Sequence, residues 1–312
     1  PFNEKAGYNI DLTIDSELQA KAEKLFTDFE GSIVALDPRS GGILAMVSNP
    51  PFDPNLFAAG IRPESWRALS QNPLHPLENR AIRGQYPPGS LFKIVMAFAA
   101  LEEKIIRPEE TIYCNGHFPF GNRVFRDWKP GGHGPINLVQ SLAQSCDVYY
   151  YTMGSHLKLE RIAKYARMFG LGKPTQFSFR EKPGLVPSDA WKRRRFKEKW
   201  YPGETISVSI GQGFNLVTPL QAANLIATVA NGGTLWKPYI VRRVWRADQK
   251  PIYEHQAEPL NRIPIGADTF AKVRHGLWEV VNGPRGTATK AAIPGVAVAG
   301  KTATAQVVHL KI

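Results

Sequence analysis

A serine and a lysine stand three residues apart at the start of an apolar segment, as Ser90 and Lys93. On a helix, side chains at positions i and i+3 share one face, so the lysine amine can reach the serine hydroxyl. A serine hydroxyl needs a neighbouring base at neutral pH, and a lysine serves as that base only when burial or a nearby cation lowers its pKa. The pair predicts a nucleophilic serine, Ser90, with Lys93 as its general base.

Two further motifs follow in order along the chain. Ser145-Cys146-Asp147 is the second, and Lys301-Thr302-Ala303 is the third. A lone Ser-x-x-Lys tetrad occurs by chance in many helices, whereas three such motifs in this order are a specific signal. The third motif supplies a second cation, which can lower the pKa of Lys93 and can anchor an anionic substrate.

Together these motifs resemble those of the penicillin-recognising serine acyl transferases. More narrowly, the chain is similar to the transpeptidase domain of class B penicillin-binding proteins of the elongation type, the penicillin-binding protein 2 group. The resemblance also extends to other short segments: Leu12-Thr13-Ile14-Asp15, Asp37-Pro38, Asn79-Arg80-Ala81, Gly211-Gln212-Gly213 and Thr218-Pro219.

The resemblance implies a peptidoglycan D,D-transpeptidase that acts through a Ser90 acyl-enzyme during cell elongation and is a target of β-lactams. Ser145 would carry a proton to the leaving amine. Lys301 would bind the substrate's terminal carboxylate by charge and Thr302 by a hydrogen bond. The alternatives are a β-lactamase or D,D-carboxypeptidase on the same fold, and a non-catalytic module that binds β-lactams or wall peptides.

Two positions differ from the usual family pattern. Asp147 occupies a place where relatives often carry asparagine, and its negative charge favours a protonated Lys93, so its role stays open. Ala303 occupies a place where glycine is usual, and its β-carbon can crowd a substrate backbone that approaches the strand. We expect the oxyanion hole to consist of the backbone N–H groups of Ser90 and Ala303.

A second constellation combines Cys114, Asp127, His133 and Cys146, spaced by 13, 6 and 13 residues. Two thiolates, an imidazole and a carboxylate form a plausible closed tetrahedral zinc set, which would be structural rather than catalytic. A metal there would hold Cys146 in place, and with it both neighbours. A Cys114–Cys146 disulfide and unlinked side chains are the alternatives, and no cofactor is expected for catalysis itself.

The apolar pattern predicts an α/β (α+β) protein. Strands at both ends around a block of helices indicate an antiparallel sheet flanked by helices plus an all-helical lobe. The resemblance implies that this is the penicillin-binding protein/β-lactamase-like transpeptidase fold. A buried central helix is expected over 91–103. Further helices are expected over 15–29, 63–69, 136–144, 148–156, 159–169, 220–231 and 269–281. Strands are expected over 8–14, 32–36, 43–47, 206–210, 239–244 and 296–308.

Composition narrows the class of partner. The 312 residues are 43% hydrophobic and 21% charged, with no apolar run of about 18 residues that would span a membrane. The net charge of +12 favours contact with something anionic. The basic residues are most concentrated in the segment 192–199. This segment is either a solvated loop or a contact for lipid head groups or an anionic wall polymer. No nucleic-acid motif accompanies it.

The resemblance also suggests the setting of the chain. Residues 1–30 are expected to lead in from an upstream pedestal domain, and residues 31–312 to form a transpeptidase domain whose C-terminal part is missing. The implied location is the periplasmic face of the bacterial inner membrane, with an N-terminal anchoring helix absent from this chain. The implied partners are peptidoglycan stem peptides, β-lactam antibiotics, a SEDS-class glycan polymerase and elongation-complex scaffold proteins.

Overall fold

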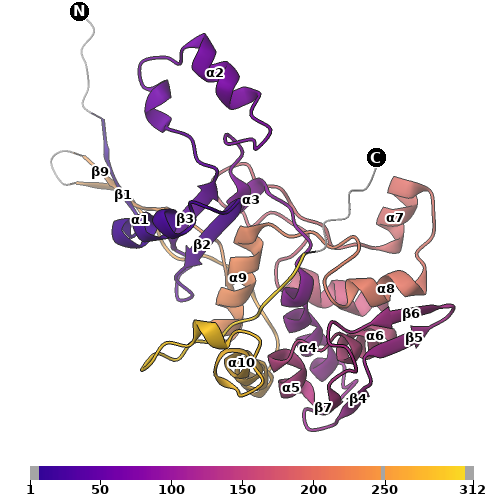
Figure 1. Cartoon of the computed structure of the whole chain (residues 1–312). Coiled ribbons are helices and arrows are strands. Elements are labelled where there is room, and N and C mark those ends of the chain that lie inside the picture. The colour runs from indigo at the N-terminus through magenta and orange to yellow at the C-terminus, as the bar shows by residue number, and fades with distance from the viewer. Residues whose placement is uncertain (1–6, 247–249, 306–312) are drawn as a thin grey trace, which may run out of the picture. The chain divides into compact units, whose positions relative to one another are not determined.

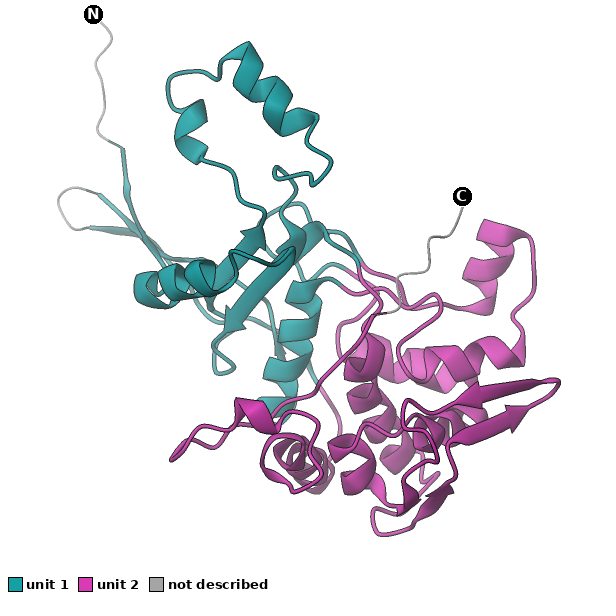
Figure 2. Cartoon of the chain, in the orientation of Figure 1, with its two compact units in different colours: residues 1–85, 174–183, 218–262 teal, residues 86–173, 184–217, 263–312 magenta. Residues whose placement is uncertain are grey.

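The computed structural model describes residues 7–246 and 250–305 (Figure 1). The chain forms two compact units, each assembled from separate stretches of sequence (Figure 2). Unit 1 comprises residues 1–85, 174–183 and 218–262, and unit 2 comprises residues 86–173, 184–217 and 263–312. Across the described residues, every helix falls short of the length and apolarity that a bilayer crossing requires.

Antiparallel strands dominate unit 1. A three-stranded sheet has the order β1-β9-β10, and two further pairs are β2 with β3 and β8 with β11. The predicted strands over 32–36 and 43–47 form an antiparallel hairpin, in which Ile33 of β2 lies opposite Val47 of β3. The strand bounds are Asn9–Leu12 (β1), Gly31–Leu36 (β2), Ile43–Asn49 (β3), Thr234–Trp236 (β8), Val241–Trp245 (β9), Pro251–Glu254 (β10) and Pro259–Arg262 (β11).

The helices of unit 1 pack on these strands. Helix α1 contacts β3, and α9 contacts β2 and β8. Asp15 caps the N-terminus of α1, because its carboxylate accepts the backbone N–H groups of Glu17 and Leu18. A core around Ile43, Phe177 and Leu220 lies within this unit. The helix bounds are Ser16–Leu25 (α1), Pro54–Phe57 (η1), Pro63–Ser70 (α2), Arg80–Arg83 (α3) and Pro219–Ala230 (α9).

Unit 2 is built around the buried helix α4. This helix packs against α6 and α10, and the Phe98 ring lies 4.9 Å from the Phe169 ring and 4.8 Å from the Phe270 ring. A break at Lys158 divides α6 into the two helices that the sequence predicts. The bounds are Gly89–Phe92 (η2), Lys93–Glu102 (α4), Leu138–Ala143 (α5), Asp147–Met168 (α6), Asp189–Phe196 (α7), Pro202–Val208 (α8), Ala267–Asn282 (α10) and Thr289–Ala291 (η3).

The helical lobe also contains strands, which the sequence did not suggest. Strand β4 (Ile112–Cys114) pairs with β7 (Gly134–Ile136), and β5 (His117–Phe120) pairs with β6 (Arg123–Arg126). The combination of an antiparallel sheet with flanking helices is confirmed, while the expectation of an all-helical lobe is wrong in this detail. The two small sheets carry or flank the first three residues of the predicted metal set.

Two predicted strands are also wrong. Residues 206–210 belong mainly to helix α8, because Pro202 occupies its first turn and the Glu204 side chain accepts the backbone N–H of Tyr201. Residues 296–305 form no strand apart from an isolated bridge between Ile293 and Val296, and residues 306–308 lie outside the described residues. Backbone groups of this last segment bond to a helix end and to a side chain instead of to a neighbouring strand.

Candidate active site

Ser90 sits in a tight turn, η2, that leads directly into α4. The preceding Gly89 has φ +51°, and its N–H donates to the Gly211 carbonyl over 3.0 Å. A Cβ at Gly211 would overlap the Gly89 carbonyl oxygen and lie 2.8 Å from the Phe92 Cβ, so only glycine allows the two segments to approach so closely. The Gly211-Gln212-Gly213 segment therefore supports the turn that presents Ser90.

Lys93 is fully buried on the first turn of α4. Its Nζ lies 2.7 Å from Asp147 Oδ1, 2.7 Å from the Ser145 carbonyl oxygen and 3.2 Å from Ser145 Oγ. These three acceptors match the three donors of an ammonium group. The structure thus brings Lys93 together with both polar residues of the second motif, and it makes Asp147 a direct partner of this lysine.

Ser145 stands at the centre of the polar contacts. Its backbone has φ +55°, a left-handed conformation that is rare for a residue with a side chain. The turn lies between the end of α5 and the start of α6, and the Cys146 side chain accepts the Tyr149 N–H as the N-cap of α6. Ser145 Oγ accepts hydrogen bonds from two lysines, Lys93 over 3.2 Å and Lys301 over 2.9 Å.

Lys301 reaches this hydroxyl from the C-terminal segment. Burial, reinforced by the positive charge of Lys93, lowers the pKa of Lys301 to about 7, although Asp147 partly opposes this. Lys301 was predicted to be a cation that lowers the pKa of Lys93. The structure shows an effect in the other direction, because the charge of Lys93 contributes to the lowered pKa of Lys301.

The segment around Lys301 is held by side chains and a helix end. The Gly300 N–H donates to the Leu277 carbonyl of α10 over 3.0 Å. The Thr302 and Thr287 hydroxyls lie 2.9 Å apart, and Gln212 Nε2 donates to the Thr304 carbonyl over 2.8 Å. These contacts place the third motif beside the Ser90 turn without a strand.

A cavity of about 820 Å³ in unit 2 joins the three motifs. Ser90, Ser145, Asp147, Thr302 and Ala303 all line it. It also has lining residues to which the sequence analysis assigned no role: Trp128, Lys129, Gln144, Gln212, Arg285 and Thr287. The sequence offered only one hint that these residues line a site, which is that several of them lie in glycine-rich loops or at helix ends.

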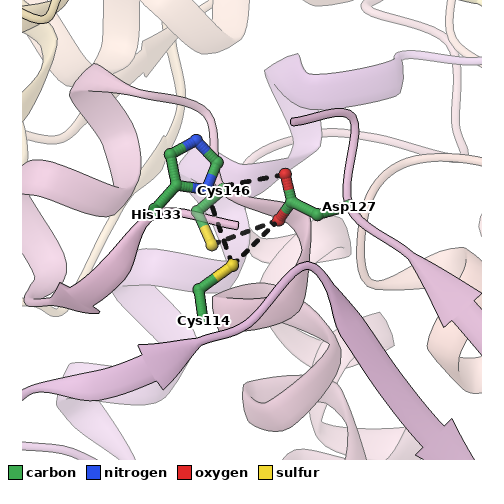
Figure 3. Close-up of side chains that lie close together, drawn as sticks. All are labelled: Cys114, Asp127, His133 and Cys146. Atoms are coloured by element: carbon green, nitrogen blue, oxygen red, sulfur yellow. Dashed lines mark hydrogen bonds and ion pairs between the residues drawn. The ribbon is translucent and has the colours of Figure 1, made fainter. Parts of the chain in front are cut away.

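The predicted metal residues also come together, as Figure 3 shows. One ligand atom from each of Cys114, Asp127, His133 and Cys146 lies within 4.8 Å of the others, and all four residues sit in a buried cluster. Asp127 Oδ2 lies 3.5 Å from Cys114 Sγ and 3.3 Å from Cys146 Sγ. His133 Nδ1 lies 3.5 Å from Cys114 Sγ and 3.5 Å from Asp127 Oδ1. The two thiols are free and form no disulfide.

Asp127 ties this cluster to the second motif. Its Oδ2 accepts the backbone N–H groups of Asp147 over 2.8 Å and Val148 over 3.0 Å, at the first turn of α6. Burial opposes ionisation of Asp127, but hydrogen bonds from the Val148 and Lys129 backbone give it a lowered pKa. A change in the cluster is therefore transmitted through one carboxylate to the residues beside Ser145.

Two groups of the cluster have shifted protonation equilibria. Burial lowers the pKa of His133, although the charge of Asp127 opposes this shift, so the imidazole is neutral at pH 7. Burial, together with the charge of Asp127, raises the pKa of the Cys146 thiol. When no metal ion is bound, the cluster therefore holds the Asp127 carboxylate, a neutral His133 imidazole and a protonated Cys146 thiol.

The arrangement of motifs agrees with comparison to known proteins. The family model described as the penicillin binding protein transpeptidase domain matches residues 31–311. The chain belongs to this transpeptidase family. It is 38% identical to the peptidoglycan D,D-transpeptidase MrdA of Haemophilus influenzae over 311 residues, covering 98% of this chain and 48% of the relative. It is 37% identical to MrdA of Escherichia coli K12, covering 98% of this chain and 49% of the relative.

Solved structures of this transpeptidase family show the same fold. Penicillin-binding protein 2 of Pseudomonas aeruginosa, in complex with WCK 5153, has a TM-score of 0.88 and is 36% identical, covering 96% of this chain and 68% of that one. The chain spans about half the length of the curated relatives it matches. The predicted family and fold class are thus confirmed.

Proposed function

We propose that this chain is the catalytic domain of a peptidoglycan D,D-transpeptidase. The observation that carries this proposal is the single cavity that gathers Ser90, Ser145, Asp147, Thr302 and Ala303 from three distant parts of the sequence. The named D,D-transpeptidases that match 98% of the chain support the same reaction class.

In the first half-reaction, Ser90 Oγ attacks the amide carbonyl of the D-Ala-D-Ala end of a stem peptide. A Ser90–acyl bond forms and D-alanine leaves with the proton taken from Ser90. Lys93, one turn along the same face, is the proposed acceptor of that proton. Because three contacts surround Lys93 Nζ, it must give up one of them to take the proton.

Ser145 and Lys301 are suited to the proton's onward transfer. Ser145 Oγ lies within hydrogen-bonding distance of both lysine amines, so it can pass a proton to the leaving amine. Lys301, with a pKa of about 7, gains a full charge when the terminal carboxylate of the substrate arrives beside it. Thr302 donates a hydrogen bond to that carboxylate, and the backbone N–H groups of Ser90 and Ala303 form the oxyanion hole.

In the second half-reaction, the amine of a neighbouring stem peptide resolves the acyl-enzyme and the Ser90 hydroxyl is restored. A β-lactam imitates the acyl donor and leaves Ser90 acylated. A β-lactamase or carboxypeptidase would use water at this step, and a non-catalytic module would not release product.

Labelling with a fluorescent penicillin tests the proposal. The wild-type chain is expected to become covalently labelled at Ser90, with the adduct located by mass spectrometry, and Ser90→Ala is expected to remain unlabelled. Equal labelling of Ser90→Ala at the same peptide would refute the assignment. Slow release of the label separates a transpeptidase from a β-lactamase, which would turn the antibiotic over rapidly.

The buried cluster fits a structural zinc ion. Zinc bonds of about 2.1–2.3 Å in a tetrahedron place ligand atoms about 3.4–3.8 Å apart. One potential ligand atom from each of the four residues lies within 4.8 Å of the others, so a bound ion would draw the set slightly closer together. Cys114, Asp127, His133 and Cys146 would hold the ion, which would displace the thiol protons. Such an ion would stabilise the position of Cys146 and therefore of Ser145 and Asp147.

The setting of the chain is proposed from its relatives. Helicobacter pylori penicillin-binding protein 2, which is 33% identical, has been solved in complex with MreC. A further similar structure describes coordination of polymerisation and cross-linking by a peptidoglycan synthase complex. By analogy, this domain would work with a SEDS-class polymerase and a scaffold protein at the periplasmic face of the inner membrane. We propose that residues 1–30 lead in from an upstream domain and that residues 31–312 belong to the transpeptidase domain.

A further inference from the structure

An arginine on the wall of the cavity has no role in the chemistry described above. Arg285 lies in the loop between α10 and η3, is exposed, and lines the same cavity as Ser90. In the described part of the chain, its side chain forms neither an ion pair nor a hydrogen bond with another residue. Its guanidinium therefore presents its donors to the cavity without a protein acceptor.

The backbone of this loop is fixed, although the arginine is exposed. The Thr287 N–H donates to the Ala143 carbonyl over 3.2 Å, and the Gly286 N–H donates to the Gly283 carbonyl over 3.0 Å. A Cβ at Gly286 would overlap the Val280 carbonyl oxygen, so the loop packs directly on the end of α10. Arg285 thus extends from a preorganised position, which reduces the entropy lost when it binds a ligand.

The loop also meets the proposed carboxylate site. The Thr287 hydroxyl lies 2.9 Å from the Thr302 hydroxyl, and Thr302 is proposed to bind the terminal carboxylate of the donor peptide. That carboxylate belongs to the D-alanine that leaves. Arg285 is two residues from Thr287 and lines the same cavity, so we place it on the leaving-group side of Ser90, which the acceptor peptide occupies after D-alanine departs.

The charge of the cavity favours an anionic acceptor. Among its lining residues, Lys129 and Arg285 are cations, and the single acid is Asp147, whose carboxylate is paired with Lys93. Lys301 adds another amine beside Ser145. A concave wall with this excess of positive charge attracts carboxylates, and a planar guanidinium binds them in a bidentate manner.

We propose that Arg285 binds a carboxylate of the acceptor peptide, distinct from the one held by Lys301 and Thr302. This inference rests on the proposed transpeptidase function and assigns Arg285 to its second half-reaction. In that step the acceptor nitrogen forms an amide bond with the acyl carbonyl, the bond from the carbonyl carbon to Ser90 Oγ breaks, and the amine's proton returns to Ser90 Oγ. Arg285 takes no part in the proton transfer; it positions the amine by holding its peptide.

The test compares D-glutamate with D-glutamine as acceptors of the same acyl-enzyme. These amino acids share the α-carboxylate and differ in one side-chain charge. The measured quantity is the ratio of transfer product to hydrolysis product from a D-Ala-D-Ala peptide donor, separated by chromatography. This ratio does not depend on how fast the acyl-enzyme forms, and penicillin labelling of Ser90 independently reports on the proposed function.

The wild type is expected to favour D-glutamate over D-glutamine in this ratio by roughly threefold to tenfold, because the carboxylate gains a bidentate but exposed partner. Arg285→Gln is expected to abolish the preference, and Arg285→Lys to retain part of it. Added salt is expected to weaken the preference in the wild type. Lys290→Gln, which removes an exposed cation on η3 outside the cavity, is the matched control and is expected to behave as the wild type.

Two results would overturn the inference while leaving the proposed function intact. One is an unchanged preference for D-glutamate in Arg285→Gln. The other is a wild type that is acylated at Ser90 but shows no preference between D-glutamate and D-glutamine. A wild type that yields only hydrolysis product with both acceptors counts as this second result. Failure of Ser90 to become labelled by penicillin would instead refute the proposed function, and this inference with it.

Discussion

Replacing Gly211 with alanine should disturb the Ser90 turn specifically. Gly211 has φ +72°, and a Cβ there would overlap the Gly89 carbonyl oxygen and lie 2.8 Å from the Phe92 Cβ. Gly213 offers a matched control on the same loop. It has φ +70°, but a Cβ there would lie 3.5 Å from the Ser207 Cβ, an ordinary contact distance.

The expected magnitudes follow from these two environments. A left-handed conformation costs an alanine about 1–2 kcal/mol, and this cost is common to both variants. Overpacking adds about 1–3 kcal/mol in Gly211→Ala alone. We therefore expect the free energy of unfolding to fall by about 1–2 kcal/mol in Gly213→Ala and by about 2–5 kcal/mol in Gly211→Ala.

Urea unfolding and penicillin labelling together check this prediction. In the absence of urea, where both variants are folded, Gly211→Ala should be acylated at Ser90 more slowly than Gly213→Ala, because its clash falls on Gly89, the residue before the proposed nucleophile. Equal loss of unfolding free energy in the two variants, with equal acylation rates, would show that Gly211 does not set the Ser90 turn. The left-handed backbone conformation would then account for the whole effect.

Three other predictions concern charge, metal and packing. Because the pKa of Lys301 is about 7, binding of an anionic penicillin draws a proton to this amine above that pH. The initial affinity should fall as pH rises through 7, and Lys301→Arg, which stays charged, should flatten that dependence in stopped-flow assays. Zinc should be released in a 1:1 ratio on denaturation, and Cys114→Ala should lower both the zinc content and the melting temperature; a metal-free wild type with full activity would contradict this. In Gly276→Ala, a Cβ 2.5 Å from Leu142 Cδ1 should lower the free energy of unfolding by about 1–3 kcal/mol, and an unchanged urea midpoint would show that α5 and α10 adjust freely.

The proposed catalytic residues could be predicted from the sequence because their motifs are local. Ser90 and Lys93 share one helical turn, and Ser145 and Asp147 flank a single residue, so their types and spacing predict chemistry directly. The adjacency of Cys114 and Asp127 to Cys146 could only be suggested from the residue types, since it depends on two small sheets that weak three- and four-residue strands do not reveal. Short strands carry too few residues for a period of two to stand out.

Other features depend on contacts that a linear pattern does not contain. The alternating residues before Lys301 predicted a strand, but Leu277 and Asn282 of α10 bind that backbone instead. The β-branched residues in 206–210 suggested another strand, although Pro202 and Glu204 already formed a helix-start signal upstream. Arg285 is an exposed residue between Pro284 and Gly286, and only the cavity reveals that it lines the same space as Ser90.

The interleaved assembly of unit 2 has a consequence for how the protein is made. Its three stretches are separated by segments of unit 1, and Lys301 follows Ser90 by about 200 residues. At a ribosomal rate of about 5–20 residues per second, Ser90, the proposed nucleophile, is synthesised roughly 10–40 s before Lys301. Ser90 and Lys301 therefore leave the ribosome at different times, and the proposed site can assemble only after both stretches of unit 2 have been synthesised.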